Sequence, residues 1–550
     1  MVKDIVKKSI GAIVSRQTNI FTAATFIILT TVFSQFLGIL KYRLLVSLFG
    51  ASSDLGVFFA AFRIPDFIFQ VVVAGALSAS FIPIFTEYIG KGKKKEAFGF
   101  TSELIFIGMV FFMVISAILI VFAYQFCSLI APGFTPKELT LMANLMIIIQ
   151  LSQIFFILGT VFTAILQSFQ HFLIPGIATA FYNFGIILGL IIFSHFLGFG
   201  IYGGTIGVLI GSFLFFILQL PLVFFAGFRF EMVLKFSQGL IRLGRLMIPR
   251  TATLIVTQIT ATANVFFASF ISARSLVVFD LAQTLAMAPV LLVGQSIAQA
   301  SFPAMSIKYE DKKAFLDIFV SSFNQILYLT MPLAALLIVL RIPLVRLFFG
   351  AQRFDWDATV DTGLTLAYFS ISMAGSAIIY LLSRAFYAYK DSRTPLYITI
   401  FSVVVNIVFS YLFVLVYHWP IYALAFSFSI GTIVAALAML YCFDKKVELP
   451  KMDMAISFLK ILISTIVMGV AVYVPIKLLD QLVFDTTKTF NLLILTGIAS
   501  LFGLAAYVFF TWLFDIKEAY YIVEVLKKFK DRDKMLAQIG EIMDGPKLNM

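Results

Sequence analysis

Long apolar stretches recur along the whole chain, and they constrain its fold more than any other feature. Each runs for about 20 residues or more, the length that an α-helix needs to cross the hydrocarbon core of a bilayer. Apolar residues make up 61% of the 550 and charged residues only 12%, against roughly 45–50% and about 25% in soluble domains. A soluble fold of this size cannot bury so much apolar surface. The composition therefore excludes a soluble enzyme, a disordered chain and a fibrous protein, and it predicts an all-α polytopic membrane protein.

The apolar stretches predict about fourteen transmembrane helices. The second stretch is long and contains Pro65, so we expect a kinked helix that extends past the membrane. The expected spans are 21–48, 57–89, 99–124, 139–168, 174–196, 203–226, 251–272, 279–305, 316–349, 363–386, 396–417, 422–443, 455–478 and 491–514.

The basic residues are distributed unevenly between alternate loops. Twenty-nine lysines and arginines fall in the termini and one set of loops, against five in the other set. Because loops rich in Lys and Arg stay in the cytoplasm, we expect both termini to be cytoplasmic, which requires an even number of spans. The net charge of +12 is then explained by topology and by contact with anionic lipid headgroups, and we expect no nucleic-acid partner.

Matched residues reveal an internal repeat. The residue numbers differ by nearly the same amount in three pairs, Phe81 with Phe302, Phe98 with Phe315, and Pro175 with Pro395. This constant offset covers six spans and therefore preserves orientation, so the sequence predicts two parallel six-helix repeats with two helices appended. Two such lobes are typical of a transporter that rocks about a central site.

The repeat predicts the domain organisation of the chain. We expect a cytoplasmic N-terminal segment at 1–20, an N-lobe at 21–226, a cytoplasmic amphipathic linker at 227–250, a C-lobe at 251–443, the last two helices at 455–514 and a cytoplasmic tail at 515–550. The mixed charge of the tail indicates that it lies at the membrane interface.

Ionisable side chains inside a membrane are costly, and most of them are functional. The candidates of this kind are Lys41, Arg43, Arg63, Asp66, Asp280, Arg341 and Arg346. Those near helix ends can also extend to the interface, which is the alternative explanation. Arg63 and Asp66 are three residues apart on one helix, so they either pair with each other or line a cavity.

The seventh and eighth spans are rich in hydroxyls and amides, which include Gln258, Asn264, Gln283 and Thr284. Their counterparts in the repeat, the first and second spans, contain Gln35, Lys41, Arg63 and Asp66. One interpretation is hydrogen bonding between helices. The concentration of polar groups in four related spans favours the other, a cavity between the lobes that is lined by spans 1, 2, 7 and 8.

No motif in the chain indicates catalysis. There is no G-x-x-x-x-G-K-[ST] loop for a nucleotide and no Ser/His/Asp set or pair of membrane carboxylates for hydrolysis. Cys127 and Cys442 are far apart and the three histidines form no cluster, so we expect neither a disulfide framework nor a metal site. We also expect no cofactor, and transport would be driven by a coupling ion, the membrane potential or consumption of the substrate.

Motifs along essentially the whole chain resemble the MurJ/MviN family. They are Phe33–Gly38, Phe58–Asp66, Gly75–Pro83, Ala131–Phe134, Gln258–Phe270 and Arg384–Pro395. The resemblance implies a flippase of lipid II in the bacterial cytoplasmic (inner) membrane, which serves peptidoglycan biosynthesis, cell-wall growth and cell shape. The family belongs to the multidrug/oligosaccharidyl-lipid/polysaccharide exporter superfamily.

The resemblance also implies a 6+6+2 arrangement of fourteen spans. A cavity between the lobes would take the headgroup, and a groove along the last two helices would take the polyprenyl tail. The apolar residues that would line this groove are Ile461, Ile463, Val467, Leu492, Leu493 and Phe502. The alternative is that these helices only pack against the second lobe. The implied partners are the lipid-linked precursor, membrane lipids and cell-wall synthesis proteins.

The chain departs from the family in the cavity residues. Gln35 and Thr284 stand where the family has Arg, and Lys41 replaces another Arg. Further departures are Tyr42, Phe69, Gln70 and Ala74. Because bidentate Arg–phosphate contacts are strong, a pyrophosphate would be bound here by Lys41, Arg43 and Arg63. Three interpretations follow: a lipid II flippase, an exporter of another lipid-linked glycan or amphiphile, and a transport-dead scaffold for cell-wall synthesis.

Overall fold

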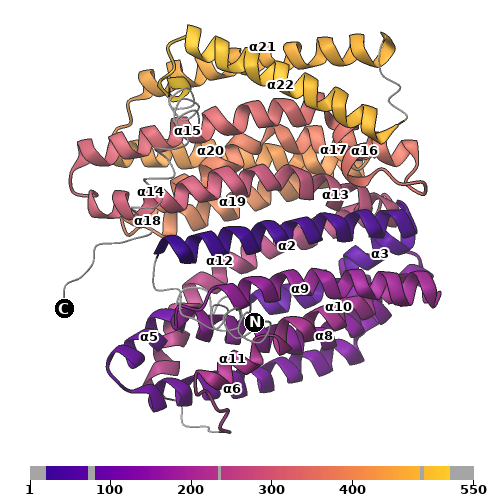
Figure 1. Cartoon of the computed structure of the whole chain (residues 1–550), viewed down its shortest axis with the longest axis vertical. Helices are drawn as coiled ribbons and strands as arrows, with labels where there is room; N and C mark the ends of the chain where they lie inside the picture. Colours follow the sequence, from indigo (N-terminus) through magenta and orange to yellow (C-terminus); the bar gives the residue numbers. More distant parts are fainter. Residues whose placement is uncertain (1–19, 72–80, 233–236, 483–487, 521–550) are drawn as a thin grey trace, which may run out of the picture. The chain divides into compact units, whose positions relative to one another are not determined.

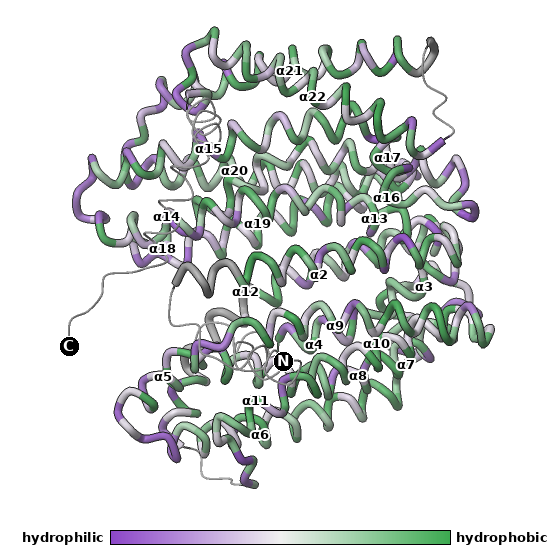
Figure 2. The backbone as a smooth tube through the Cα atoms, viewed as in Figure 1, coloured by the Kyte–Doolittle hydropathy of each residue, from purple (hydrophilic) through white to green (hydrophobic). Residues whose placement is uncertain are grey.

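The computed structural model describes residues 20–71, 81–232, 237–482 and 488–520, and all regular structure in them is helical (Figure 1). Eleven helices are long and apolar enough to cross a membrane, or twelve if the bent pair Trp356–Ile371 and Met373–Ala388 forms one span. Apolar residues run along most of these helices (Figure 2). The chain is therefore an all-helical, multi-span membrane protein, as the composition predicts.

The helices of the first half of the chain are α2 (Ile20–Phe49), α3 (Ser53–Ala61), α4 (Arg63–Phe69), α5 (Ile82–Gly90), α6 (Lys94–Val121), α7 (Ala123–Ile130), α8 (Pro136–Ser168), α9 (Leu173–Gly189), η3 (Leu190–Phe196), α10 (Ile201–Ile217), α11 (Leu220–Phe225) and α12 (Gln238–Ser269). The others are α13 (Ala273–Pro289), η4 (Val290–Gln295), α14 (Ser296–Ile307), α15 (Lys312–Val339), α16 (Arg341–Phe349), α17 (Trp356–Ile371), α18 (Met373–Ala388), α19 (Arg393–Ser410), η5 (Tyr411–Val416), α20 (Tyr422–Val447), α21 (Lys451–Leu482) and α22 (Thr489–Leu513).

Two of the expected spans have no full counterpart among the described helices. The stretch 57–89 is represented by α3, α4 and α5 and contains the undescribed residues 72–80, among them Ala74. The stretch 251–272 falls on α12, whose apolar part is Leu254–Ser269. The count of fourteen therefore stays a prediction. The expected N-terminal segment and most of the expected tail lie outside the described residues.

Side-chain caps mark where several helices begin. Thr135 and Glu138 form a capping box at α8, in which Glu138 N–H donates to Thr135 Oγ1 and Thr135 N–H donates to Glu138 Oε2. Ser237 Oγ accepts from Leu240 N–H at α12, and Asp311 Oδ1 accepts from Ala314 N–H at α15. These bonds satisfy N–H groups that a helix leaves without partners.

The helices repeat along the chain at a nearly constant offset. Helix α6, which begins at Lys94, and helix α15, which begins at Lys312, have 28 residues each. Helices α9 and α19 both continue into a π-helix, η3 and η5, and these end at Phe196 and Val416, at nearly the same offset. The internal repeat that the sequence predicts is thus present in the helix lengths and in their breaks.

Left-handed backbone conformations repeat in the same way. Gln170 and Lys390 occupy matched positions of the repeat and have φ angles of 63° and 57°. Gly198 and His418 have φ angles of 70° and 54° at the same separation. This conformation is unfavourable for residues other than glycine, so its recurrence at Gln170, Lys390 and His418 shows that the repeat preserves turn geometry even where the residue type changes.

The chain forms two compact units. The first comprises Met1–Val277 with Phe349–Asp355, and the second comprises Val278–Phe348 and Trp356–Met550. Arg274 ties the short segment to the first unit, because its Nη2 donates to both carboxylate oxygens of Asp355 at 2.7 and 2.8 Å. The border lies within α13, whereas the predicted repeats divide near residue 250. The predicted domain boundaries therefore stay predictions.

Close helix packing in the first unit depends on glycine. Helices α9 and α10 lie against each other, and a Cβ at Gly185 would be 2.3 Å from the Cα of Gly211. One at Gly189 would be 2.2 Å from the Cα of Gly207. Small residues of this kind let backbones approach in a membrane, where helix association depends on packing.

In the second unit, α21 packs on α15 and lies beside α22 (Figure 1). Tyr507 of α22 donates its hydroxyl to the Tyr328 carbonyl oxygen at 2.8 Å, and the two ring centres are 5.2 Å apart. Ile461 and Leu492, two residues of the expected tail groove, are buried. Ile463, Leu493 and Phe502 are exposed.

Candidate functional site

Lys41, Asp66 and Tyr182 form a polar cluster inside the first unit. They lie on α2, on the first turn of α4 and on α9, so three segments far apart in the chain supply them. The Asp66 carboxylate interacts electrostatically with Lys41 and with Tyr182. Opposite charges shielded from water attract each other more strongly than on a soluble surface. The carboxylate therefore compensates a lysine charge that is otherwise costly inside a membrane.

Aromatic rings surround this cluster. Lys41 Nζ lies 4.6 Å from the centre of the Tyr42 ring, a distance typical of a cation–π contact. The Tyr42 ring lies 6.0 Å from that of Phe59, and the Tyr182 ring lies 5.1 Å from that of Phe156. These rings shield the charged groups from water and lower the local dielectric constant, which strengthens their interactions.

Asn183 connects α9 to α2. Its Nδ2 donates to the carbonyl oxygen of Ser34 at 3.3 Å and to Ser34 Oγ at 3.4 Å. Gly38, one turn further along α2, lies against the same amide, since a Cβ there would be 3.9 Å from Nδ2. Gln35 is exposed. The contacts of Asn183 fix α2 against α9 and thereby position Lys41, further along α2, beside α9.

Arg63 and Arg43 differ in their exposure. Arg63 begins α4 and is partly buried, whereas Arg43 on α2 is exposed. A helix start at Arg63 puts Pro65 in the first turn, where its missing N–H is tolerated. Arg63 and Asp66 are three residues apart on this helix and therefore share a face. The sequence predicts this neighbourhood, and the structure adds Lys41 to it.

Helix α12 lies against α4 in the same unit and contributes amides. Asn264 is 4% exposed, and no described residue donates a hydrogen bond to its Oδ1. Gln258 is partly exposed. The end of α12 is held by Ser269, whose Oγ accepts from Gly133 N–H at 3.1 Å. A buried amide oxygen without a donor can accept a hydrogen bond from a ligand or a water molecule.

In the second unit, α13 presents Asp280, Gln283 and Thr284, which are all partly exposed. Thr284 Oγ1 donates to the Asp280 carbonyl oxygen at 2.8 Å, so the hydroxyl proton of Thr284 is engaged in a hydrogen bond within its own helix. Helix α13 ends at Pro289 and continues into the π-helix η4, a feature that is frequent at functional sites. That residues of both units line one cavity stays a prediction.

Arg341 makes a contact that serves a helix end. It begins α16, and its Nη1 donates to the carbonyl oxygen of Ile338 near the end of α15 at 2.9 Å. The last carbonyls of a helix lack partners, and a cation near them is favourable. This contact makes Arg341 a suitable control for the site arginines.

The sequence alone does not single out Tyr182, Asn183 or Glu103. Tyr182 and Asn183 are an adjacent polar pair in the middle of the span 174–196, whose other polar residues are Thr179, Ser194 and His195. Glu103 lies on α6, is 2% exposed and accepts from the Ser237 N–H at 3.1 Å. It therefore anchors the segment that leads into α12.

The chemistry of the cluster suits an anionic, polar ligand. Arg63 can offer two parallel N–H donors to a phosphate, and Lys41 offers a compact charge. Asn264 and Gln258 can hydrogen-bond to neutral polar groups. Within the described ranges, no group of three or more His, Cys, Asp or Glu could hold a metal ion.

A repeat of membrane-spanning helices with charged and amide side chains inside it defines a polytopic transporter. The model of the family "Lipid II flippase MurJ" matches residues 45–494. The chain therefore belongs to the MurJ lipid II flippase family, whose members are transporters and not enzymes.

Individual relatives agree with this membership. A "Probable lipid II flippase MurJ" of Buchnera aphidicola subsp. Acyrthosiphon pisum is 26% identical over 82% of this chain and 89% of its own length. The "Lipid II flippase MurJ" of Burkholderia cenocepacia is 25% identical over 72% of this chain and 78% of its own length.

Solved structures show the same fold. The structure titled "Lipid II flippase MurJ, inward closed conformation" has a TM-score of 0.75 at 24% identity and covers 89% of this chain and 98% of its own. An inward-facing MATE transporter of the MOP superfamily has a TM-score of 0.63 at 14% identity and covers 76% of this chain and 94% of its own. The fold is thus that of the MOP superfamily.

Proposed function

We propose that this chain flips lipid II, the lipid-linked peptidoglycan precursor, across the bacterial cytoplasmic membrane. The observation that supports this most strongly is the match of the family model to residues 45–494. The excess of lysines and arginines in the termini and alternate loops supports cytoplasmic termini. The two lobes would expose the headgroup site alternately to the two sides.

We place the pyrophosphate of the substrate at Lys41 and Arg63. Asp66 interacts electrostatically with Lys41. An arriving phosphate would compete with this carboxylate for the lysine, so binding would release Asp66. Because an uncompensated charge inside a membrane is costly, this release would favour a rearrangement of α4 relative to α2. Arg43 is exposed on α2 and would meet the headgroup at the entrance.

The neutral part of the headgroup would contact amides, a hydroxyl and the Asp280 carboxylate. Gln258 and Asn264 on α12 would hydrogen-bond to it in the first unit, and Asp280, Gln283 and Thr284 on α13 would do so in the second. Gln35 extends this set along α2. The unused acceptor of Asn264 supports this assignment.

The polyprenyl tail would stay in the lipid along α21 and α22. Ile463, Leu493 and Phe502 are exposed there and would guide it, whereas Ile461 and Leu492 hold the two helices in the core. Transfer of a tail from lipid to such a surface gains little free energy. The groove would therefore orient the tail more than bind it.

The replaced arginines support two further candidates, an exporter of another lipid-linked glycan or amphiphile and a transport-dead scaffold that recruits cell-wall synthesis proteins. Gln35 and Thr284 cannot bind a phosphate bidentately. Complementation of a strain depleted of its own lipid II flippase separates these candidates. Growth supports flipping of lipid II, and failure with proven membrane insertion contradicts it. Arg341→Ala should complement as well as the native chain, whereas Arg63→Ala should not.

A further inference from the structure

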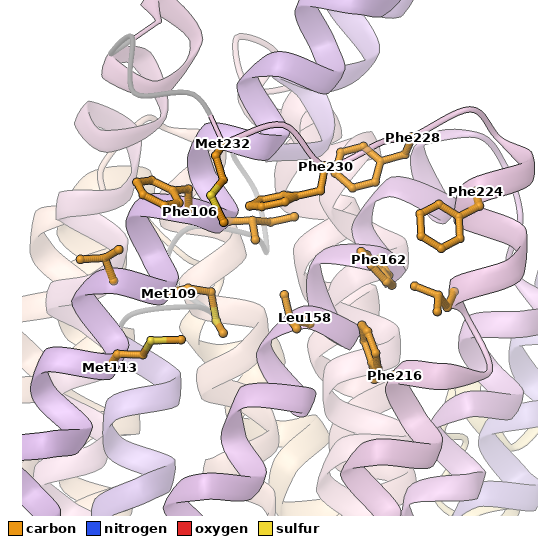
Figure 3. Close-up of a pocket in the computed structure, with 13 residues that line it drawn as sticks. Phe106, Met109, Met113, Leu158, Phe162, Phe216, Phe224, Phe228, Phe230 and Met232 are labelled. Carbon is orange, nitrogen blue, oxygen red and sulfur yellow. The ribbon is translucent and has the colours of Figure 1, made fainter.

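An apolar groove of about 460 Å³ lies in the first unit (Figure 3). Its volume is in the range of small-molecule sites. Side chains of α6, α8, the ends of α10 and α11, and the segment 228–232 form its walls. The lining residues are Ile105, Phe106, Met109, Val110, Met113, Leu158, Phe162, Phe216, Leu220, Phe224, Phe228, Phe230 and Met232. None of them is polar.

The matched face of the second unit is covered by protein. With the first residues of α6 and α15 aligned, Val110 and Met113 correspond to Tyr328 and Met331. The pairing of Phe98 with Phe315 shifts the match by one residue, to Leu327 and Thr330, which are both 0% exposed. Tyr328 and Met331 are 2% and 9% exposed, and Tyr328 contacts Tyr507 of α22, whereas Val110 and Met113 are 48% and 52% exposed. The groove in the first repeat therefore corresponds to the face of α15 on which the appended helices pack in the second repeat.

The two faces differ in the occupant that they suit. In the second unit, polar groups join the helices: Tyr507 donates to the Tyr328 carbonyl, and the Tyr328 hydroxyl lies 3.3 Å from Thr511 Oγ1. Such bonds are typical of helix–helix contacts in membranes. The groove offers no polar side chain, and its Phe and Met side chains can adapt to a flexible ligand. It therefore suits a hydrocarbon chain better than a helix.

Cations lie beside one end of the groove. Lys94 Nζ is 5.5 Å from the ring centre of Phe98, whose ring is in turn 5.5 Å from that of the lining residue Phe228. A Cβ at Gly227 would be 3.3 Å from the same Nζ. Arg229, next to Phe228, is exposed. Two positive groups thus flank the segment that closes this end of the groove.

The net charge at this end is positive. Lys93 pairs with Glu96 at 3.0 Å, and the Glu103 carboxylate is used by the Ser237 N–H. Glu231 is exposed nearby, and its backbone N–H donates to Ser102 Oγ at 3.3 Å. Lys94, Lys95 and Arg229 carry three positive charges against the two negative charges of Glu103 and Glu231, so the rim keeps a net positive charge that is complementary to an anionic headgroup.

We propose that this groove binds one acyl chain of an anionic phospholipid, whose phosphate is held by Lys94 and Arg229. The acyl chain gains little by leaving the surrounding lipid, since both environments are apolar. The headgroup contacts therefore determine which lipid is retained, at about fivefold in affinity for each cation. The bound lipid fills in the first unit the place that α21 and α22 fill in the second.

Native mass spectrometry of the full chain in detergent tests this, with phosphatidylglycerol and phosphatidylcholine of the same acyl chains as probes. Phosphatidylglycerol should bind more tightly. Lys94→Gln and Arg229→Gln should each weaken it about fivefold and leave phosphatidylcholine unchanged. Lys137→Gln, a substitution of an exposed lysine in the first turn of α8, is the control.

A second pair of variants tests the groove itself. Leu158→Trp fills it and displaces the acyl chain, so the phosphate also leaves Lys94 and Arg229, and phosphatidylglycerol binding should weaken at least about tenfold. Leu151→Trp, two turns earlier on the same helix and exposed outside the groove, should have no effect. Equal affinity for the two lipids, or an equal effect of the two tryptophans, would overturn the proposal. A dimer that Leu158→Trp dissociates, or tighter binding of a polyprenyl pyrophosphate, would assign the groove to another occupant.

Discussion

The two compact units use the same helix face in different ways. In the second unit, α21 packs on α15 and Tyr328 and Met331 of α15 are buried, whereas in the first unit the matched Val110 and Met113 of α6 are about half exposed. The two helices have the same length and the same place in the repeat. The difference therefore arises from what covers the face and not from the backbone. Each six-helix repeat leaves one apolar face uncovered, and the appended helices cover that face only in the second repeat.

Tyr507→Ala should cause the largest loss of folding stability, because it disrupts the packing on the covered face of α15. Tyr507 is buried in α22 and contacts Tyr328 by its ring and its hydroxyl. Because the unfolded chain remains in lipid, the hydrophobic transfer energy is small, but the cavity and lost contacts cost about 2–4 kcal/mol. Thermal unfolding in detergent should show a large fall in the midpoint. Val110→Ala on the open face is the control and should change stability by less than about 0.5 kcal/mol.

Met331→Ala and Met113→Ala compare the same substitution on the two faces. Met331 is covered and Met113 is not, so the first should cost about 1–3 kcal/mol and the second less than about 0.5 kcal/mol. The same unfolding assay checks this. Equal losses would mean that the open face of α6 is packed as tightly as that of α15.

The turns at His171 and Asp391 are also matched, since each follows a left-handed residue of the repeat, but only the second unit has a carboxylate there. Burial raises the pKa of Asp391, but hydrogen bonds from the Thr394 backbone and side chain and from Lys446 outweigh it and lower this pKa to about 2. Lys446 Nζ lies 3.0 Å from Asp391 Oδ2. A carboxyl whose pKa is lower in the folded state stabilises that state above its unfolded pKa, and this contribution is lost as the pH falls toward 2.

Asp391→Asn should therefore cost about 1 kcal/mol at pH 7, and the difference from the native chain should shrink between pH 4 and pH 2. Unfolding midpoints measured at pH 7, pH 4, pH 3 and pH 2 check this. For His171→Asn, the matched substitution in the first unit, the difference in unfolding midpoint from the native chain should not shrink between pH 4 and pH 2. A difference for Asp391→Asn that stays constant down to pH 2 would contradict the assigned contacts.

Tyr507→Phe is the mildest change. It removes the hydroxyl that donates to the Tyr328 carbonyl at 2.8 Å but keeps the ring. Hydrogen bonds between membrane helices contribute about 0.6 kcal/mol on average, so the unfolding midpoint should fall only slightly. A loss as large as that of Tyr507→Ala would show that the hydroxyl, and not ring packing, holds α22 in place.

Much of the fold can be predicted from the sequence, because hydrophobic length determines a membrane helix almost by itself. The span 174–196, for example, is observed as Leu173–Phe196. The repeat is visible in matched motifs and reappears in matched helices. The break at Ser372 within the span 363–386, which bends α17 against α18 by 41°, has no sequence signal of this kind. It depends on packing, since the Ser429 Oγ bonds to Tyr368 and Ser372 there.

The candidate site could be predicted only in part. Arg63 and Asp66 are neighbours because helical periodicity makes them so. The addition of Lys41 and Tyr182 depends on how α2 and α9 pack, which Asn183 and Ser34 help to fix. A single polar pair in an apolar span does not reveal such a contact. The open face of α6 is equally hidden, since its residues are as apolar as those of any lipid-facing helix.

Flipping of fluorescent lipid II by the purified chain in proteoliposomes tests the account most directly. We expect the native chain to accelerate flipping over empty vesicles. Arg63→Ala should lower the rate at least about tenfold, which is about 1.4 kcal/mol, without lowering the amount of folded protein. Arg341→Ala, which alters only the helix-end contact, should flip at the native rate. A native chain no faster than empty vesicles would contradict the proposed function, and a silent Arg63→Ala beside an impaired Arg341→Ala would contradict the proposed site.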